Sequence, residues 1–144
     1  MTTPTWALVA FATWTLVLMM GTIGVYRWSR ILTGRAAISE FRAEPVEGKD
    51  WYRRAMRAHA NCIENLPVFG AIVLAIHESH AAGAAIDVIA VAIPAARVVQ
   101  SLVHVCLRQT NPVVAVRFTF FLVQVVGLLC LAGAVVGRAG IPAT

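Results

Sequence analysis

Four long apolar stretches constrain this chain more than any other feature. They run from about Trp6 to Trp28, Trp51 to Ile76, Ala84 to Leu107 and Val113 to Val136. Each is near the roughly 20 residues that an α-helix needs to cross a bilayer. Strands are a poor alternative, because an open strand in lipid leaves backbone groups unpaired and the stretches lack the alternation of a membrane barrel. The sequence therefore predicts an all-α membrane protein, a bundle of four transmembrane helices.

The composition agrees with this class and argues against several others. Hydrophobic residues make up 59% of the 144 residues and charged residues 13%, about half the charged fraction of a soluble domain. The length fits one domain over residues 1–144. The net charge of +5 does not indicate nucleic acid, because the basic residues are too few and too segregated. Three isolated cysteines without CxxC spacing predict neither a disulfide framework nor a metal site.

The connections between the stretches differ in charge. The first, about Ser29 to Asp50, carries most of the Lys and Arg together with its borders, and the second, HESHAAG, carries none. The third, RQTNP, is flanked by Arg108 and Arg117. The positive-inside rule then places the first and third connections in the cytoplasm. We expect both termini on the non-cytoplasmic side of the cell (inner) membrane.

Polar residues interrupt the second stretch at helical spacing. Arg57, Asn61 and Glu64 stand at i, i+4 and i+7, which places them within about 60° of one another on one face. At 1.5 Å per residue, Glu64 lies about 20 Å below the cytoplasmic end of the helix. Arg53, one turn before Arg57, can share this face.

The third stretch has a polar face of its own, formed by Arg97, Gln100, Ser101 and His104. Arg97 lies about 15 Å below the cytoplasmic end, near the depth of Glu64. A buried arginine and a buried glutamate are each costly in lipid unless they find partners. We therefore expect the two to face each other, directly or across a ligand or a subunit boundary.

These residues leave more than one interpretation open. A single ion pair can be a structural clamp, whereas two polar faces at matched depth favour a binding cavity. A transporter is poorly supported, because no repeat or pair of broken helices is visible. Neither a nucleophile constellation nor a glycine-rich phosphate loop is present. Gln124, alone in the fourth stretch, is expected to form an interhelical hydrogen bond.

The segment RAHANCIENLPVF, residues 57–69, resembles the signature of the MAPEG family, the membrane-associated proteins in eicosanoid and glutathione metabolism. It is similar to the pattern RAxxNxxExxPxF of microsomal glutathione transferases, leukotriene and prostaglandin E synthases and the lipoxygenase-activating protein. The four spans, the length and the long polar first connection agree. The resemblance implies a homotrimer of four-helix subunits that binds glutathione between subunits, near the cytoplasmic side.

The resemblance also implies roles for particular residues. Glutathione would be held by the six residues Arg53, Arg57, Asn61, Glu64, Arg97 and Gln100, with Arg117 and His104 as the catalytic pair that stabilises its thiolate. Arginines can clamp the two carboxylates of glutathione, and Glu64 can accept its ammonium group. The sequence departs from the family at Ala60, which replaces an arginine of some members. The third helix also lacks tyrosines, and the spacing from His104 to Arg117 is longer than in the synthases.

The expected function is therefore a membrane-embedded transferase or peroxidase that uses glutathione or another low-molecular-weight thiol. Its second substrate would be a lipophilic electrophile or hydroperoxide that arrives from the membrane lipids. The alternative is a non-catalytic lipid-binding or partner-binding protein on the same scaffold, since the lipoxygenase-activating protein keeps much of the motif without catalysis. A structural bundle with a buried charge clamp is the third possibility.

Overall fold

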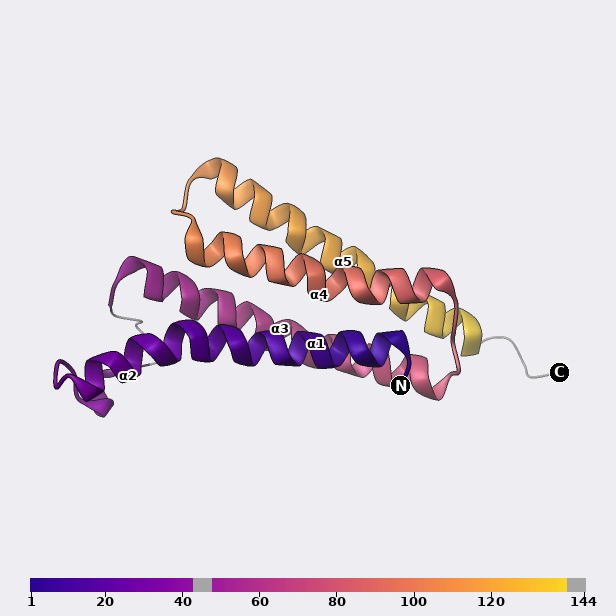
Figure 1. Ribbon diagram of the computed structural model, residues 1–144. Coiled ribbons are helices and arrows are strands. Elements are labelled where there is room, and N and C mark those ends of the chain that lie inside the picture. Colours follow the sequence, from indigo (N-terminus) through magenta and orange to yellow (C-terminus); the bar gives the residue numbers. More distant parts are fainter. Residues whose placement is uncertain (43–47, 140–144) are drawn as a thin grey trace.

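The computed structural model describes residues 1–42 and 48–139, and this part of the chain is helical apart from short turns (Figure 1). Four helices within it are long and apolar enough to cross a membrane. No strand occurs among the described residues. The elements are α1 (Thr3–Leu18), η1 (Met19–Gly24), α2 (Val25–Leu32), η2 (Ile38–Glu40), α3 (Asp50–Glu78), α4 (Ala84–Cys106) and α5 (Asn111–Ala139). The predicted all-α, multi-pass membrane fold is confirmed.

The first span is one continuous helix built from three segments. It runs through α1, η1 and α2 over Thr3–Leu32, and η1 is a π-helical turn in which the backbone widens. At the start of that turn, the Thr22 hydroxyl donates a hydrogen bond of 2.6 Å to the Leu18 carbonyl. Such side-chain bonds to the preceding turn are known to bend helices. The first span continues to Leu32, and α2 extends past the ends of the other helices (Figure 1).

The helices form a layered bundle with α4 in the middle. It packs against α1, α3 and α5, and α5 in turn touches α3 more sparsely. Figure 1 shows the first connection and the α4–α5 loop at one end, and the N-terminus and the α3–α4 turn at the other. This arrangement gathers the arginine-rich connections at a single end of the bundle.

Two interior contacts show how the helices pack against one another. Phe11 of α1 and Phe69 of α3 are fully buried with ring centroids 6.0 Å apart. On the other side of α4, Gly127 of α5 lies so close to Ile93 that a Cβ built on the glycine would stand 3.0 Å from the isoleucine Cγ1. Close backbone approach at small residues is the usual way in which membrane helices associate.

An aromatic cluster fastens α2 to the beginning of α3. Tyr26 stacks on Tyr52 at 4.2 Å and meets the edge of Trp51 at 5.4 Å. The Arg27 Nε donates a hydrogen bond of 2.8 Å to the Tyr52 hydroxyl. Gly48 lies against the same rings with a φ of 129°, where a Cβ would come within 2.9 Å of the Tyr26 hydroxyl. The cluster thereby fixes where α3 begins, one residue before the span expected from hydropathy.

Candidate functional site

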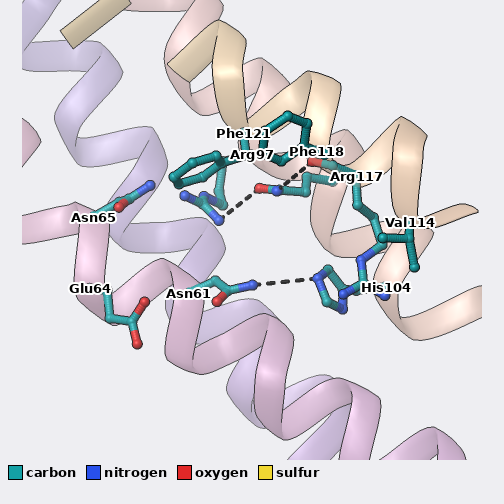
Figure 2. Close-up of a pocket in the computed structure, with 10 residues that line it drawn as sticks. Asn61, Glu64, Asn65, Arg97, His104, Val114, Arg117, Phe118 and Phe121 are labelled. Atoms are coloured by element: carbon teal, nitrogen blue, oxygen red, sulfur yellow. Dashed lines mark hydrogen bonds between the residues drawn. The ribbon is translucent and has the colours of Figure 1, made fainter. Parts of the chain in front are cut away.

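A polar cavity of about 230 Å³ lies between α3, α4 and α5, in the half of the bundle nearer the arginine-rich end (Figure 2). Both polar faces expected from the sequence contribute to it. Its walls are formed by Asn61, Glu64 and Asn65 of α3, Arg97, Gln100 and His104 of α4, and Val114, Arg117, Phe118 and Phe121 of α5. The helical spacing on α3 and α4 thus brings side chains from residues 61 to 104 around one space.

Glu64 and Arg97 share this cavity without touching. No ion pair joins them in the part of the chain that the structure describes, and Glu64 is exposed in the single chain whereas Arg97 is only 2% exposed. Direct pairing, one of the arrangements that we expected, is therefore absent. A ligand or a neighbouring subunit between the two charges is the arrangement that stays open.

A buried amide network holds Arg97 instead. The Arg97 Nη1 donates a hydrogen bond of 2.8 Å to the Gln100 Oε1, which also accepts one of 3.1 Å from the Gln124 Nε2. The Gln100 Nε2 donates to the Arg117 carbonyl at 2.8 Å. The interhelical hydrogen bond expected for Gln124 is thus present. Gln100 connects α4 to α5, and both ends of its amide are already engaged by the protein.

Asn61 and His104 close the cavity toward the arginine-rich end. The Asn61 Nδ2 lies 3.4 Å from the His104 Nε2 (Figure 2). His104 is only 3% exposed, and it lines the cavity together with residues of α3 and α5. The pair bridges the two faces that sequence periodicity had identified separately.

Three buried donor atoms on residues that line the cavity have no hydrogen-bond partner within the described chain. They are the Asn65 Nδ2, the Arg97 Nε and the Arg117 Nε. Buried polar groups are almost always paired, and an unpaired one costs about 1–3 kcal/mol. Of the ten lining residues, Glu64 is the one acid. The lining residues therefore include two arginines, three donor atoms without a partner in the chain and a single carboxylate, a set that suits a mainly anionic ligand.

A search against protein-family models matches residues 4–137 to the MAPEG family. The match begins in the first turn of α1 and ends in the last turn of α5, so it covers nearly the whole chain. The chain belongs to the MAPEG family. Searches of the curated proteins and of the solved structures returned no significant match. The MAPEG family includes glutathione transferases and related proteins, and its members generally use glutathione.

A second cavity of about 600 Å³ adjoins the first toward the arginine-rich end of this MAPEG bundle. It shares His104 and Arg117 with the inner cavity, so these two residues form the wall between them. The other lining residues are Asp50, Arg53, Arg54, Arg57 and Gln109. The residues expected on one face of α3 thus divide between two adjoining hollows, with Arg53 and Arg57 in the outer one.

The arginines of the outer cavity differ in how they are paired. Asp50 forms a salt bridge with Arg53 at 3.7 Å and another with Arg54. Among the described residues, neither Arg57 nor Arg117 has a carboxylate partner. These two guanidinium groups are the ones left for an anion that enters from the arginine-rich end. No three metal-ligating side chains converge in residues 1–42 or 48–139.

Ser101 departs from the face to which its spacing assigned it. Its hydroxyl donates a hydrogen bond of 2.8 Å to the Arg97 carbonyl and lies 3.6 Å from the Cys62 sulfur. Both side chains are buried away from the cavity. Ser101 and Cys62 therefore contribute to the packing of α3 on α4.

Four lining residues of this MAPEG site were not foreseen from the sequence. Asn65 lies four residues after Asn61, so its helical spacing placed it near the polar face of α3, although it was not assigned to the site. Val114, Phe118 and Phe121 form an apolar wall on α5. They stand at i, i+4 and i+7, a spacing that was visible in the sequence but was indistinguishable from a lipid-facing surface.

Proposed function

We propose that this MAPEG protein binds glutathione, or another low-molecular-weight thiol, in the inner cavity and delivers its sulfur to a lipophilic electrophile or hydroperoxide. The observation that carries the proposal is the set of three unpaired buried donors at one cavity that also holds a single carboxylate. Glutathione offers two carboxylates and one ammonium group. These charged groups match the lining of the inner cavity more closely than a neutral lipid does.

Each charge on glutathione then has a counterpart on the protein. The guanidinium groups of Arg97 and Arg117 and the amide of Asn65 donate to carboxylate or carbonyl oxygens, and Glu64 accepts the ammonium group. Asn61 supplies a further polar contact. Arg57 and Arg53 extend the positive wall outward, where they draw the anionic thiol from the aqueous side.

We assign Arg117, which lines both cavities, the role of stabilising the thiolate. A cation beside a thiol lowers its pKa and so raises the fraction of the nucleophilic form. In conjugation, the thiolate sulfur forms a bond to an electrophilic carbon, and the displaced group leaves with its bonding electrons. With a hydroperoxide, the thiolate attacks the O–O bond and releases an alcohol, and the resulting sulfenic acid is reduced by a second thiol to a disulfide and water. His104, which shares the wall with Arg117, contacts the same region.

The apolar wall on α5 fits a second substrate that arrives through the bilayer. Phe118 and Phe121 are 57% and 40% exposed, with ring centroids 6.3 Å apart. Their exposed surfaces lie in a membrane-spanning helix, and their inner surfaces line the same cavity as Arg117. A lipophilic compound dissolved in the membrane lipids therefore reaches the thiol without crossing water.

The site favours an assembly of several subunits, and we propose a homotrimer in the cell (inner) membrane with both termini on the non-cytoplasmic side. Glu64 is exposed on one subunit although it lies well inside a membrane span. An ionised carboxylate in contact with lipid is strongly unfavourable. A neighbouring copy that covers the exposed side of α3 at Glu64 removes this contact.

One observation favours the alternative, a non-catalytic protein that binds lipids or partners on the same scaffold. None of the ten lining residues carries a hydroxyl group, so the thiolate depends on Arg117 and His104 alone. If neither lies close enough to the sulfur, glutathione binds as the thiol and no transfer follows.

A titration of thiol ionisation separates these functions. Glutathione is added to the purified oligomer at fixed pH, and both thiolate absorbance and direct binding are measured. S-methylglutathione, whose sulfur cannot form a thiolate, is the control. We expect thiolate formation with the wild type and its loss in Arg117→Ala. Arg108→Ala, which removes an exposed arginine that lines neither cavity, should behave as the wild type. Binding without ionisation would support the non-catalytic alternative, and no binding would refute the proposal.

A further inference from the structure

Arg54 connects the first turns of α3 to the last turn of α4 through main-chain carbonyls. Its Nε donates a hydrogen bond of 3.1 Å to the His104 carbonyl, and its Nη2 donates one of 3.2 Å to the Val105 carbonyl. The Nη1 donates to the Asp50 carboxylate. The side chain is 13% exposed, so an arginine from the most basic part of the chain is folded inward and engaged on all three nitrogens.

These contacts provide hydrogen-bond donors for carbonyl groups at the C-terminal end of α4. The helix ends at Cys106, and the last carbonyls of any helix lack partners within it. A planar guanidinium presents its N–H groups in a fixed fork, which matches two successive carbonyls. Its positive charge is also favourable beside the negative end of the helix dipole. Arg54 therefore terminates α4 from another helix, 50 residues earlier in the chain.

The residue held in this way is one that the thiol site uses. The His104 carbonyl accepts from Arg54, and the His104 ring lies 3.4 Å from Asn61 and lines both cavities. A shift of the last turn of α4 would therefore move the ring away from Asn61. It would also alter the wall that His104 forms with Arg117.

We propose that Arg54 is a positioning residue, which fixes the last turn of α4 so that the His104 ring closes the inner cavity. It acts on the site through α4 and makes no contact with the thiol. This inference rests on the proposed function for its effect on thiol binding, whereas the contact between α3 and α4 stands without it.

The alternative is that Arg54 is one more cation for an anionic ligand, since it also lines the outer cavity. An Arg54→Lys substitution distinguishes the positioning role from the role as a cation for the ligand. Lysine keeps the charge but has no planar fork, so it restores an electrostatic role and fails to bridge two carbonyls.

The experiment compares Arg54→Lys, Arg54→Met and the wild type as purified oligomers, with Arg108→Lys as the matched control. Arg108 is exposed at the same end of the bundle and makes no side-chain hydrogen bond among the described residues. Two quantities are measured: amide hydrogen exchange over residues 102–107, and the affinity and thiolate fraction of bound glutathione. Exchange reports local opening of α4 and requires no ligand.

We expect both Arg54 variants to raise amide exchange in the last turn of α4 by about tenfold, the factor expected for one lost hydrogen bond. Both should also weaken glutathione binding by about tenfold and lower the thiolate fraction. Arg54→Lys is the mild variant that keeps the test decisive if Arg54→Met fails to fold. Arg108→Lys should leave all three quantities unchanged.

The possible outcomes have separate meanings. Wild-type exchange in Arg54→Lys would overturn the inference, because charge alone would then be sufficient. Faster exchange with unchanged glutathione binding would also overturn it, because α4 would be loosened without consequence for the site. A wild-type protein that binds no glutathione would refute the proposed function. In that case, faster exchange in the variants would still support the contact itself.

Discussion

Replacing Glu64 by glutamine tests the charge pattern of the inner cavity most directly. Glu64 is the one acid among the ten lining residues, so no other carboxylate of the cavity can take over its role. The variant keeps the size of the side chain and removes its charge. A charge-assisted hydrogen bond contributes about 1.5–3 kcal/mol, so glutathione binding should weaken by about tenfold to a hundredfold.

The ligand can be varied together with the protein to isolate this contact. An analogue of glutathione that lacks the ammonium group should bind the wild type more weakly than glutathione does. It should bind Glu64→Gln at least as well as the wild type, because removing the carboxylate also removes a repulsion from the ligand's acids. Calorimetric titration of both ligands against both proteins gives the coupling energy between Glu64 and the ammonium group of glutathione. An equal loss for the two ligands would show that Glu64 does not meet the ammonium group, and the proposed pose would be refuted.

Two further substitutions test other parts of the structure. Arg57→Ala should weaken glutathione binding by about 1.5–3 kcal/mol in the same titration, and an unchanged affinity would remove the outer cavity from the site. Gly127→Ala should lower the melting temperature in detergent, because its Cβ would stand 3.0 Å from Ile93 and overpacking costs about 1–3 kcal/mol. Gly133→Ala on the same helix meets nothing within 4 Å and should leave the melting temperature unchanged or raise it, so equal effects of the two would contradict the close packing.

Hydropathy was sufficient to place the four spans but not the helix ends. The second stretch, expected from Trp51 to Ile76, is a helix from Asp50 to Glu78. Apolar residues mark where a helix meets lipid, whereas its backbone hydrogen bonds continue into the polar interface. The π-helical turn at η1 had no clear signal, because Gly21 and Gly24 are common residues in membrane helices.

The site was predictable as far as periodicity reaches. The i, i+4, i+7 spacing of Arg57, Asn61 and Glu64 identified the polar face of α3, and depth along the helix matched it to Arg97. The division of that face into two cavities depends on where the end of α4 lies, which no local pattern encodes. Arg54 was read only as part of the basic cluster, because its partners are carbonyls 50 residues away. Tertiary contacts of this kind leave no trace in the spacing of one helix.

Under the proposed function, the wall of His104 and Arg117 would give the two reactants separate routes to the same sulfur. A water-soluble thiol would reach this wall through the arginine-lined outer cavity, and a lipophilic compound would approach from the side of Phe118 and Phe121. Binding of one reactant would then not require release of the other. A bulky multivalent anion lodged in the outer hollow should accordingly compete with the thiol and leave the affinity for the lipophilic partner untouched.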